Sequence, residues 1–196
     1  MEEARITETN DLMSSANEQA AGIAARRQAG MEAVITAFQA LLIRYAARLI
    51  NNPAAAQDIV QNVFIKLFQQ WQPGMQPDAR LKNWLFRVTH NEAVDFIRAE
   101  ARRNRLHDEH AEVVTRETGG VHADPPADER EAVVLRCLNV LDPGERQVVL
   151  LRLQQGMSYE EISAVTGQSV GYVGNRLHFA VKRLAMEVRR QEGGVA

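Results

Sequence analysis

The sequence predicts an all-α protein of two small helical domains, an N-terminal helical bundle and a C-terminal helix-turn-helix domain, joined by an acidic flexible linker. Apolar residues recur at three- and four-residue spacing over residues 31–106 and again over 131–190, as in amphipathic helices. The segment between them, 107–130, contains Gly119-Gly120 and Pro125-Pro126, which favour a solvated connection. No segment shows a convincing strand pattern. These three observations define the fold class.

Three helices are predicted in the first domain, residues 31–106. The first covers residues 31–50. Asn52 can cap the second, with Pro53 at its first position, and Asp78 can cap the third. The expected apolar stripes are Val34, Ile35, Phe38, Leu41, Leu42, Tyr45 and Leu49 in the first helix, Ala56, Ile59, Val60, Val63, Phe64, Leu67, Phe68 and Trp71 in the second, and Leu81, Trp84, Leu85, Val88, Phe96 and Ile97 in the third.

Residues 1–30 form an N-terminal extension with a weaker pattern. They are polar and alanine-rich, and Gly22 and Gly30 are expected to interrupt any long helix, so we expect disorder or conditional helix here. Charge separates the other segments. Lys and Arg number six against three Asp and Glu in residues 82–106, two against eight in 107–131, and seven against five in 141–190. Two mildly basic blocks therefore flank an acidic linker.

The second domain, residues 131–190, reads as a helix-turn-helix. After "EAVVLRCLNVL" and a "DPGE" break, "ERQVVLLRLQQG" and "SYEEISAVTG" precede the last helix, and Ser158 with Glu161 forms a capping box. On a helical wheel the last helix has a packing side of Val170, Val173, Leu177, Ala180, Val181, Leu184 and Val188. Its opposite side carries Gly171, Tyr172, Asn175, Phe179, Lys182 and Arg183, with Arg176 on the flank.

A helix-turn-helix presents that outer side to the major groove of DNA. Asn175 suits adenine, Arg176 suits guanine, and Lys182 and Arg183 suit phosphates. A solvated charged surface is the plainer interpretation of the same residues. Gly174 is expected to allow close packing of the preceding helix. For Gly171, helix packing and close approach to DNA are equally supported.

Composition argues against several function classes. The chain has 196 residues, a net charge of −2 and 45% hydrophobic residues, without an apolar run near the roughly 20 residues that span a bilayer. We therefore expect a cytoplasmic protein with no membrane insertion. The single Cys137 is predicted to be a buried structural thiol. No phosphate-binding glycine loop, HExxH or CxxC motif is present, and the five histidines lack ligand spacing. We expect no catalytic residues, cofactor or metal, hence no enzyme.

Four motifs in order resemble one family. They are "DIVQNVF" at 58–64, "WLFRVTHN" at 84–91 with Asp95 and Arg98 after it, "LDPGERQV" at 141–148, and "YEEIS" at 159–163. Over about residues 31–106 and 131–188 the chain resembles the bacterial ECF (extracytoplasmic function) sigma factors, small members of the main sigma family that direct RNA polymerase to promoters. Asn62, "VGYVGNRLHFA" and Phe179 depart from the family pattern, chiefly in the last helix.

The resemblance implies a role for each part of the chain. Residues 31–106 would be sigma region 2, which binds core polymerase and recognises and melts the −10 element, and 131–190 would be region 4, which recognises the −35 element. The implied partners are core RNA polymerase (its β′ clamp helices and β flap), promoter DNA and an anti-sigma factor. The residues implied for core binding are Asp58, Gln61, Asn62 and Ile65.

In these sigma factors the loop before the third helix captures a flipped base of the −10 element, and its counterpart here is 72–83. The candidate −10 residues are Lys82, Asn83, Arg87, Arg98, Arg102 and Arg103, with Arg105 also able to hold phosphate. The candidate −35 residues are Gly171, Tyr172, Asn175, Arg176, Phe179, Lys182 and Arg183. The plainer alternatives are same-helix ion pairs for the arginines and a solvated stripe with one stray Ile65 for the core-binding set.

Two other functions fit parts of the sequence. A sigma-like decoy would bind an anti-sigma factor without starting transcription, and the departures in the last helix would suit it. A classical regulator would use the C-terminal helix-turn-helix alone, which leaves residues 31–106 without a purpose.

Overall fold

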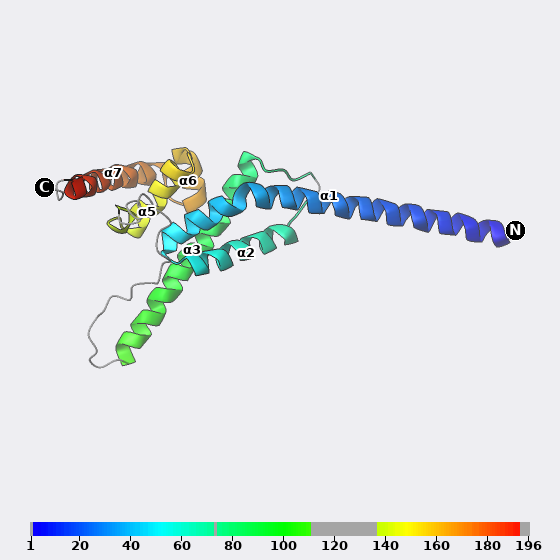
Figure 1. Ribbon diagram of the computed structural model, residues 1–196, viewed down its shortest axis with the longest axis horizontal. Coiled ribbons are helices and arrows are strands. Elements are labelled where there is room, and N and C mark those ends of the chain that lie inside the picture. Colours follow the sequence, from blue (N-terminus) through cyan, green and yellow to red (C-terminus); the bar gives the residue numbers. More distant parts are fainter. Residues whose placement is uncertain (1, 73, 111–136, 193–196) are drawn as a thin grey trace.

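The computed structural model describes residues 2–72, 74–110 and 137–192, and every regular element in them is a helix (Figure 1). The predicted all-α fold is therefore confirmed. Of the predicted linker, residues 107–110 belong to the end of the third helix, and 111–130 lie outside the described residues. In Figure 1 the N-terminus lies at the far end of one long helix, and the C-terminal helices gather at its other end.

The first domain consists of α1 (Glu2–Ile50), α2 (Pro53–Gln69) and α3 (Ala79–His110). The predicted caps are confirmed, because the Asn52 side chain accepts from the Ala55 backbone N–H at 3.1 Å and Asp78 accepts from the Leu81 N–H at 2.7 Å. These carboxylate and amide oxygens satisfy backbone donors that a helix start leaves free. The capped helices then bury their apolar faces against one another, with Leu42, Val63 and Leu85 fully enclosed.

One polar pair lies inside this core. The Tyr45 hydroxyl and His90 Nδ1 are 3.0 Å apart, and the Tyr45 ring packs edge-on against Phe86 at 5.5 Å between centroids. Burial lowers the pKa of His90 to about 4, with the Arg98 charge contributing less, and burial raises the pKa of Tyr45. The imidazole is therefore neutral at pH 7, and its Nδ1 shares one hydrogen bond with the Tyr45 hydroxyl. Sequence reasoning did not place His90 in the core.

The N-terminal extension differs from expectation. Neither Gly22 nor Gly30 interrupts α1, which is one helix from Glu2 to Ile50. A helical glycine costs about 1 kcal/mol relative to alanine, and at Gly30 a tertiary contact explains its presence. A Cβ added there would lie 2.8 Å from Trp71 Cζ2, so the indole ring rests directly on the α1 backbone.

Helix α1 also contains the one stretch among the described residues, Ala21–Ile50, that is long and apolar enough to cross a membrane by length and composition alone. The sequence reading did not expect such a run. Several of its apolar side chains, Val34, Phe38 and Leu42 among them, form the core of the domain. A helix that buries its apolar face in a protein core passes the same test, so the finding is weak evidence for a membrane span.

The second domain contains α5 (Pro143–Val149), a π-helical turn η1 (Leu150–Gln154), α6 (Tyr159–Thr166) and α7 (Val170–Glu192). The Ser158–Glu161 capping box is confirmed. The "DPGE" break is itself a capped helix start, because Asp142 and Glu145 form a second capping box. Cys137 is buried, as predicted.

The packing sides of the helices are narrower than the wheels predict. In α7, Val173, Leu177 and Ala180 are buried, but Val181 is 50% exposed, and Val170 and Val188 are exposed as well. Phe68 of α2, expected in the core stripe, is 53% exposed. A wheel identifies an apolar side but not how much of it a neighbouring helix covers.

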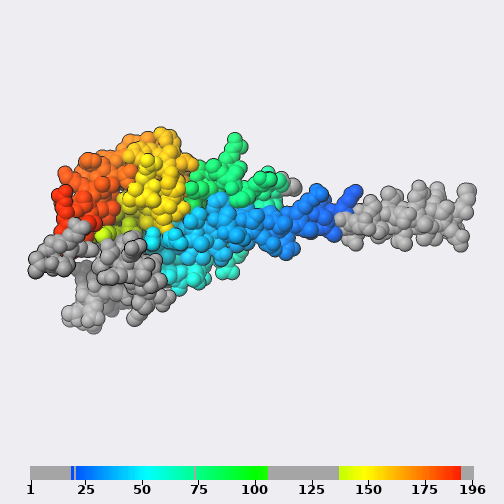
Figure 2. Space-filling model, turned by 45° about the horizontal axis from the view of Figure 1, so that its top comes forward, coloured from blue at the N-terminus to red at the C-terminus, as the bar shows by residue number. Residues whose placement is uncertain are grey.

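The two domains touch through α3 and α6 (Figure 2). Lys82 Nζ donates to the Gln155 carbonyl oxygen at 3.0 Å, and Asn83 Nδ2 donates to Glu161 Oε1 at 3.3 Å. Buried atoms on both sides of this contact, Asn83 Oδ1 and Gln155 Nε2, have no hydrogen-bond partner. Each such atom costs about 1–3 kcal/mol in desolvation, so the contact is poorly satisfied.

Candidate functional site

The predicted polymerase-binding residues lie together on the solvent side of α2. Asp58, Gln61, Asn62 and Ile65 are all exposed, and Ile65 keeps 48% of its surface accessible. Their three-and-four spacing places them in one stripe because α2 is regular from Pro53 to Gln69. The apolar face of the same helix, centred on Ile59 and Val63, is buried in the domain core.

A groove of about 720 Å³ runs beside this stripe, between α1 and α2. It shares Gln61 and Ile65 with the stripe and continues to Phe68, and its α1 wall includes Ile35 and Ile43. Exposed apolar side chains beside polar groups occur at protein-binding surfaces. The groove could not be predicted from the sequence, because its two walls come from different helices.

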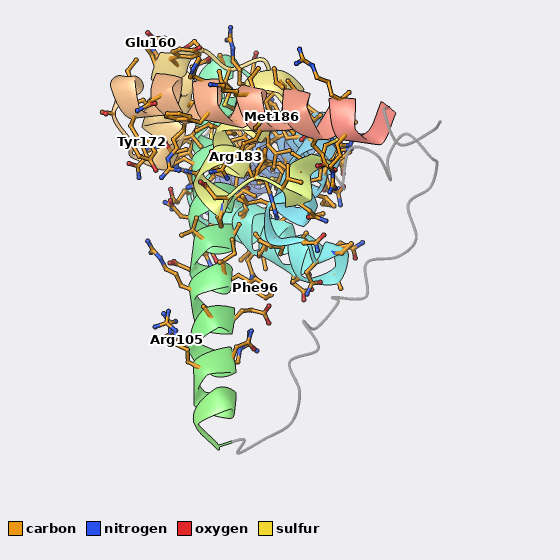
Figure 3. The ribbon with its side chains drawn as sticks, turned by 90° about the vertical axis from the view of Figure 1, so that its left-hand side faces the viewer. Phe96, Arg105, Glu160, Tyr172, Arg183 and Met186 are labelled. Atoms are coloured by element: carbon orange, nitrogen blue, oxygen red, sulfur yellow. The ribbon has the colours of Figure 1, made fainter. Side chains whose placement is uncertain are left out.

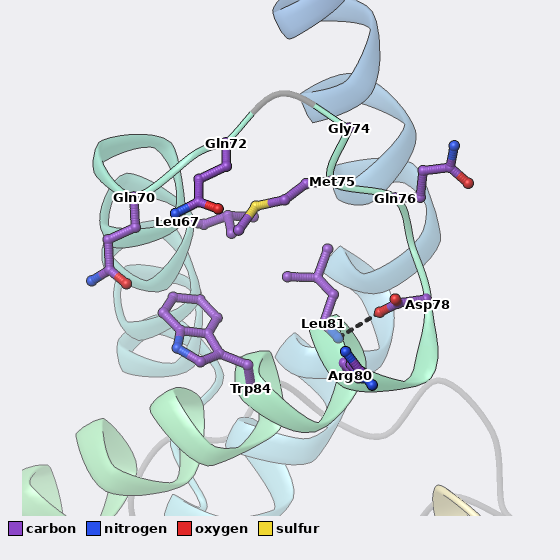
Figure 4. Close-up of a pocket in the computed structure, with 10 residues that line it drawn as sticks. All are labelled: Leu67, Gln70, Gln72, Gly74, Met75, Gln76, Asp78, Arg80, Leu81 and Trp84. Carbon is purple, nitrogen blue, oxygen red and sulfur yellow. Dashed lines mark hydrogen bonds between the residues drawn. The ribbon is translucent and has the colours of Figure 1, made fainter.

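A second hollow, of about 590 Å³, lies where the loop 71–78 joins α2 to α3 (Figure 4). Apolar side chains line part of it, and amides, a carboxylate and a guanidinium line the rest. Its lining residues are Leu67, Gln70, Gln72, Gly74, Met75, Gln76, Asp78, Arg80, Leu81 and Trp84. Asp78 is already engaged in capping α3. The loop that is predicted to capture a base therefore borders a surface hollow.

The lining differs from the expected set. Lys82 and Asn83 do not line this hollow but contact the second domain. Trp84, expected in the core, is half-buried and also forms a wall of the hollow. Gln70 and Arg80 also line the hollow, and the sequence analysis did not predict either. They lie on opposite sides of the loop, so they become neighbours only when the loop folds back between α2 and α3.

The predicted −10 arginines lie along α3 beyond the domain contact. Arg87, Arg98, Arg102, Arg103 and Arg105 are all exposed, and Figure 3 shows Arg105 on the part of α3 that projects from the body of the protein. Two of them also make same-helix pairs, Arg98 with Asp95 at 3.4 Å and Arg103 with Glu100 at 3.5 Å. Exposed pairs of this kind are worth at most about 1 kcal/mol, so the guanidinium groups can exchange them for phosphates.

The outer side of α7 divides into two parts. Gly171, Asn175, Phe179 and Lys182 are exposed. Tyr172 and Arg183, labelled in Figure 3, lie on the side that faces α5.

Arginines of α7 hold carboxylates at the start of α5. Arg176 Nη1 donates to Asp142 Oδ2 at 2.8 Å, its Nε donates to the Tyr172 hydroxyl at 2.8 Å, and Arg183 pairs with the buried Glu145 at 3.2 Å. The two carboxylate partners, Asp142 and Glu145, lie more than 30 positions before these arginines, where no local pattern reveals the pairing.

The two glycines of α7 have different surroundings. A Cβ at Gly171 would meet nothing within 4 Å, so this position faces open space rather than a packed helix. A Cβ at Gly174 would lie 3.5 Å from the Tyr159 ring of α6, an ordinary van der Waals contact. Gly174 therefore faces α6 as predicted, but the packing does not require glycine there.

Among the described residues no group of three or more His, Cys, Asp or Glu side chains is placed to hold a metal ion. The surfaces that stand out are instead an exposed helix stripe, a hollow beside a loop and a row of cations. Such surfaces bind proteins and nucleic acids.

Two parts of the chain match known protein regions. Residues 34–103 match Sigma-70 region 2, and residues 131–184 match Sigma-70, region 4. The RNA polymerase sigma-E factor of Streptomyces avermitilis is 30% identical over 154 residues, covering 79% of this chain and 82% of that protein. The ECF RNA polymerase sigma factor SigL of Mycobacterium tuberculosis is 30% identical over 179 residues, covering 89% and 96%.

Solved structures share the fold. The sigma factor RpoE of Bartonella quintana, determined with the anti-sigma factor NepR, has a TM-score of 0.61 at 24% identity and covers 79% of this chain and 94% of its own. CnrH, determined with the cytosolic domain of CnrY, has a TM-score of 0.59 at 26% identity, covering 87% and 95%. With both sigma regions in order and relatives matched over most of their length, this chain belongs to the ECF RNA polymerase sigma factors.

Proposed function

We propose that this sigma factor binds core RNA polymerase through the α2 stripe (Asp58, Gln61, Asn62 and Ile65), opens promoter DNA at the loop hollow between α2 and α3, and holds the −35 element with α7. The observation that carries the proposal is the exposure of the α2 stripe beside an apolar groove, on the domain that also contains the hollow. The stripe is free for a partner because α2 buries its opposite, apolar face in the domain core.

The α2 stripe suits the β′ clamp helices of polymerase. Ile65 and Phe68 supply apolar area that contributes about 25 cal/mol for each Å² covered. Asp58 and Gln61 add polar groups that fix orientation. A sigma factor that relies on this surface can recognise promoters with a net charge of −2, because polymerase supplies part of the affinity.

The loop hollow suits a base flipped out of the −10 element. Unstacking a base costs a few kcal/mol, which stacking and hydrogen bonds in a pocket must offset. Trp84 and Leu81 offer apolar surface, while Gln70, Gln72 and Gln76 offer amide donors and acceptors for a base edge. The arginines of α3 would hold the adjoining phosphates.

The contact between α3 and α6 limits when DNA can bind. Lys82 and Asn83 are proposed to reach −10 DNA, yet both donate to residues of the second domain. The domains must therefore separate at this point. The unpartnered Asn83 Oδ1 and Gln155 Nε2 favour separation, since opening the contact lets water reach both atoms.

Regulation and location complete the proposal. The two solved relatives were determined with anti-sigma partners, NepR and CnrY, and a similar partner would regulate this chain. We place the protein in the cytoplasm, as a transcription initiation factor with no enzymatic activity or cofactor of its own.

The deciding experiment adds the purified chain to core polymerase and measures transcription from promoter fragments. Promoter-dependent transcripts support the sigma function. Binding to an anti-sigma factor without transcripts supports the decoy, and tight operator binding without polymerase supports a classical regulator.

Arg176→Ala is expected to weaken −35 recognition more than −10 recognition. The ion pair with Asp142 is half-buried, so losing it lowers the stability of the second domain. Losing a guanidinium that reads guanine also costs about 1–3 kcal/mol of binding, at the −35 element alone. The measurement is run-off transcription on one promoter carrying base changes in either element.

Asp142→Asn is the matched control, because asparagine keeps the α5 cap and removes only the charge that Arg176 contacts. This variant should retain −35 recognition. Equal losses at −35 in the two variants would assign Arg176 to the ion pair rather than to DNA.

A further inference from the structure

The loop 71–78 has a hollow on a second side, of about 650 Å³, which α1 closes. Its α1 wall consists of Ile23, Arg26, Arg27 and Gly30, and the rest comes from Trp71 and the loop residues 74–76. The α1 wall precedes the segment that matches Sigma-70 region 2, which begins at residue 34. The extension therefore adds a surface that the matched region does not contain.

Two contacts fix this wall in place. Arg27 Nη2 donates to the Phe68 carbonyl oxygen at 2.7 Å, and its guanidinium carbon lies 4.3 Å from the centre of the Phe68 ring. The Trp71 ring packs directly against Gly30 and leaves no room for a Cβ there. The cation thus sits at the C-terminal end of α2, where the helix dipole favours positive charge. The extension is docked on the end of α2 rather than merely passing it.

The chemistry of the hollow is cationic and aromatic. Arg26 and Trp71 combine with apolar Ile23 and Met75, and no carboxylate is among the lining residues. Arg26 is exposed, and Ile23 is 61% exposed, so a ligand can enter from solvent. A cation beside an indole ring matches an anionic chain that carries flat rings, which is single-stranded nucleic acid. An acidic peptide would use the charge but not the ring.

Continuity with the promoter hollow identifies which strand. Gly74, Met75 and Gln76 line both cavities, so the two hollows lie on the two sides of one short loop. A strand that places one base in the first hollow leaves along this loop. We propose that the second hollow binds a neighbouring unpaired nucleotide of that same DNA strand, with Trp71 stacking on the base and Arg26 holding its phosphate. This inference rests on the proposed function.

The test compares two arginines of α1 in the full chain bound to core polymerase. The probe is fluorescein-labelled single-stranded dT12, and its anisotropy gives affinity at several salt concentrations. We expect Arg26→Ala to bind about three- to tenfold more weakly and to lower the salt slope by about 0.7, the value for one single-strand phosphate contact. Arg26→Lys should restore most of the affinity, because it keeps the charge.

Arg44→Ala is the matched control, since Arg44 is exposed on the same helix and lies outside the hollow. It should bind dT12 like the unchanged protein. If Arg26→Ala and Arg44→Ala bind equally, the inference is overturned. If Arg26→Ala weakens the binding of labelled ten-residue polyglutamate but leaves dT12 affinity unchanged, the hollow takes an acidic peptide and the inference is equally overturned.

Gly30→Ala tests the aromatic wall without removing a charge. Alanine favours the helix over glycine, so this variant should keep α1 folded. The new methyl group must push the Trp71 ring aside. We expect weaker dT12 binding and a red shift of tryptophan emission, and unchanged binding despite the red shift would exclude Trp71 from the site.

Co-elution of the unchanged chain with core polymerase is measured first. If the chain does not co-elute with core polymerase, the proposed function fails. The dT12 titrations on the free chain at low salt then still decide the inference, because every lining residue of the hollow belongs to this chain. A free chain that then binds no dT12, or that binds it equally with Arg26→Ala, overturns the inference as well.

Discussion

Replacing Asp58 by arginine is expected to abolish binding to core RNA polymerase while leaving the fold intact. Asp58 is exposed at the N-terminal end of the α2 stripe. Placing a cation where polymerase meets a carboxylate costs several kcal/mol through repulsion and lost pairing, and each 1.4 kcal/mol is a tenfold loss of affinity. We therefore expect at least a hundredfold weaker binding, measured by fluorescence anisotropy of labelled sigma factor with core polymerase.

The matched control is Asp95→Arg on α3. It makes the same change of charge at an exposed carboxylate whose same-helix pair with Arg98 is worth little. Both variants should unfold within about 0.5 kcal/mol of the unchanged protein, as expected for surface substitutions. Unchanged affinity in Asp58→Arg, or an equal loss in the control, would falsify the assignment of the stripe.

The parts of this fold that could be predicted from the sequence are local. A helix cap is a contact between residues three positions apart, so the caps at Asn52 and Asp78 and the Ser158–Glu161 capping box could all be predicted from the sequence. The α2 stripe could be predicted for the same reason, since the spacing of its residues is set by one regular helix. Its role in binding polymerase stays a proposal.

The parts that could not be predicted depend on residues far apart in the chain. Gly30 was expected to interrupt α1 because its cost is local, whereas the Trp71 ring that occupies its place lies 41 positions later. The Lys82 contact with Gln155 spans 73 positions, and Arg176 meets Asp142 across 34. Such pairings follow from how whole helices pack, so no window along the sequence contains them.

His90 was hidden for the same reason, and it gives the second large effect. The unfolded state of the first domain binds a proton on this imidazole near its ordinary pKa of 6.5, whereas the folded state, with a pKa of about 4, does not. Between those values the unfolded state holds more protons, so the free energy of unfolding falls as pH falls. Stability is complete above pH 6.5, and about 3 kcal/mol is lost by pH 4. That is a large part of the 5–15 kcal/mol typical of a domain.

Urea unfolding followed by tryptophan fluorescence measures this change in the first domain alone, because both tryptophans, Trp71 and Trp84, lie there. From pH 7.5 to 5.5, where few carboxylates titrate, His90 should account for a loss of about 1 kcal/mol. His90→Gln removes the titrating group, so this variant should be less stable at pH 7.5 yet lose that part of the pH dependence. His178→Gln, which changes an exposed histidine of α7, should retain it. If His90→Gln keeps the full pH dependence, the buried imidazole is not the group that the acid protonates, and the Tyr45 hydroxyl is not held by a neutral His90.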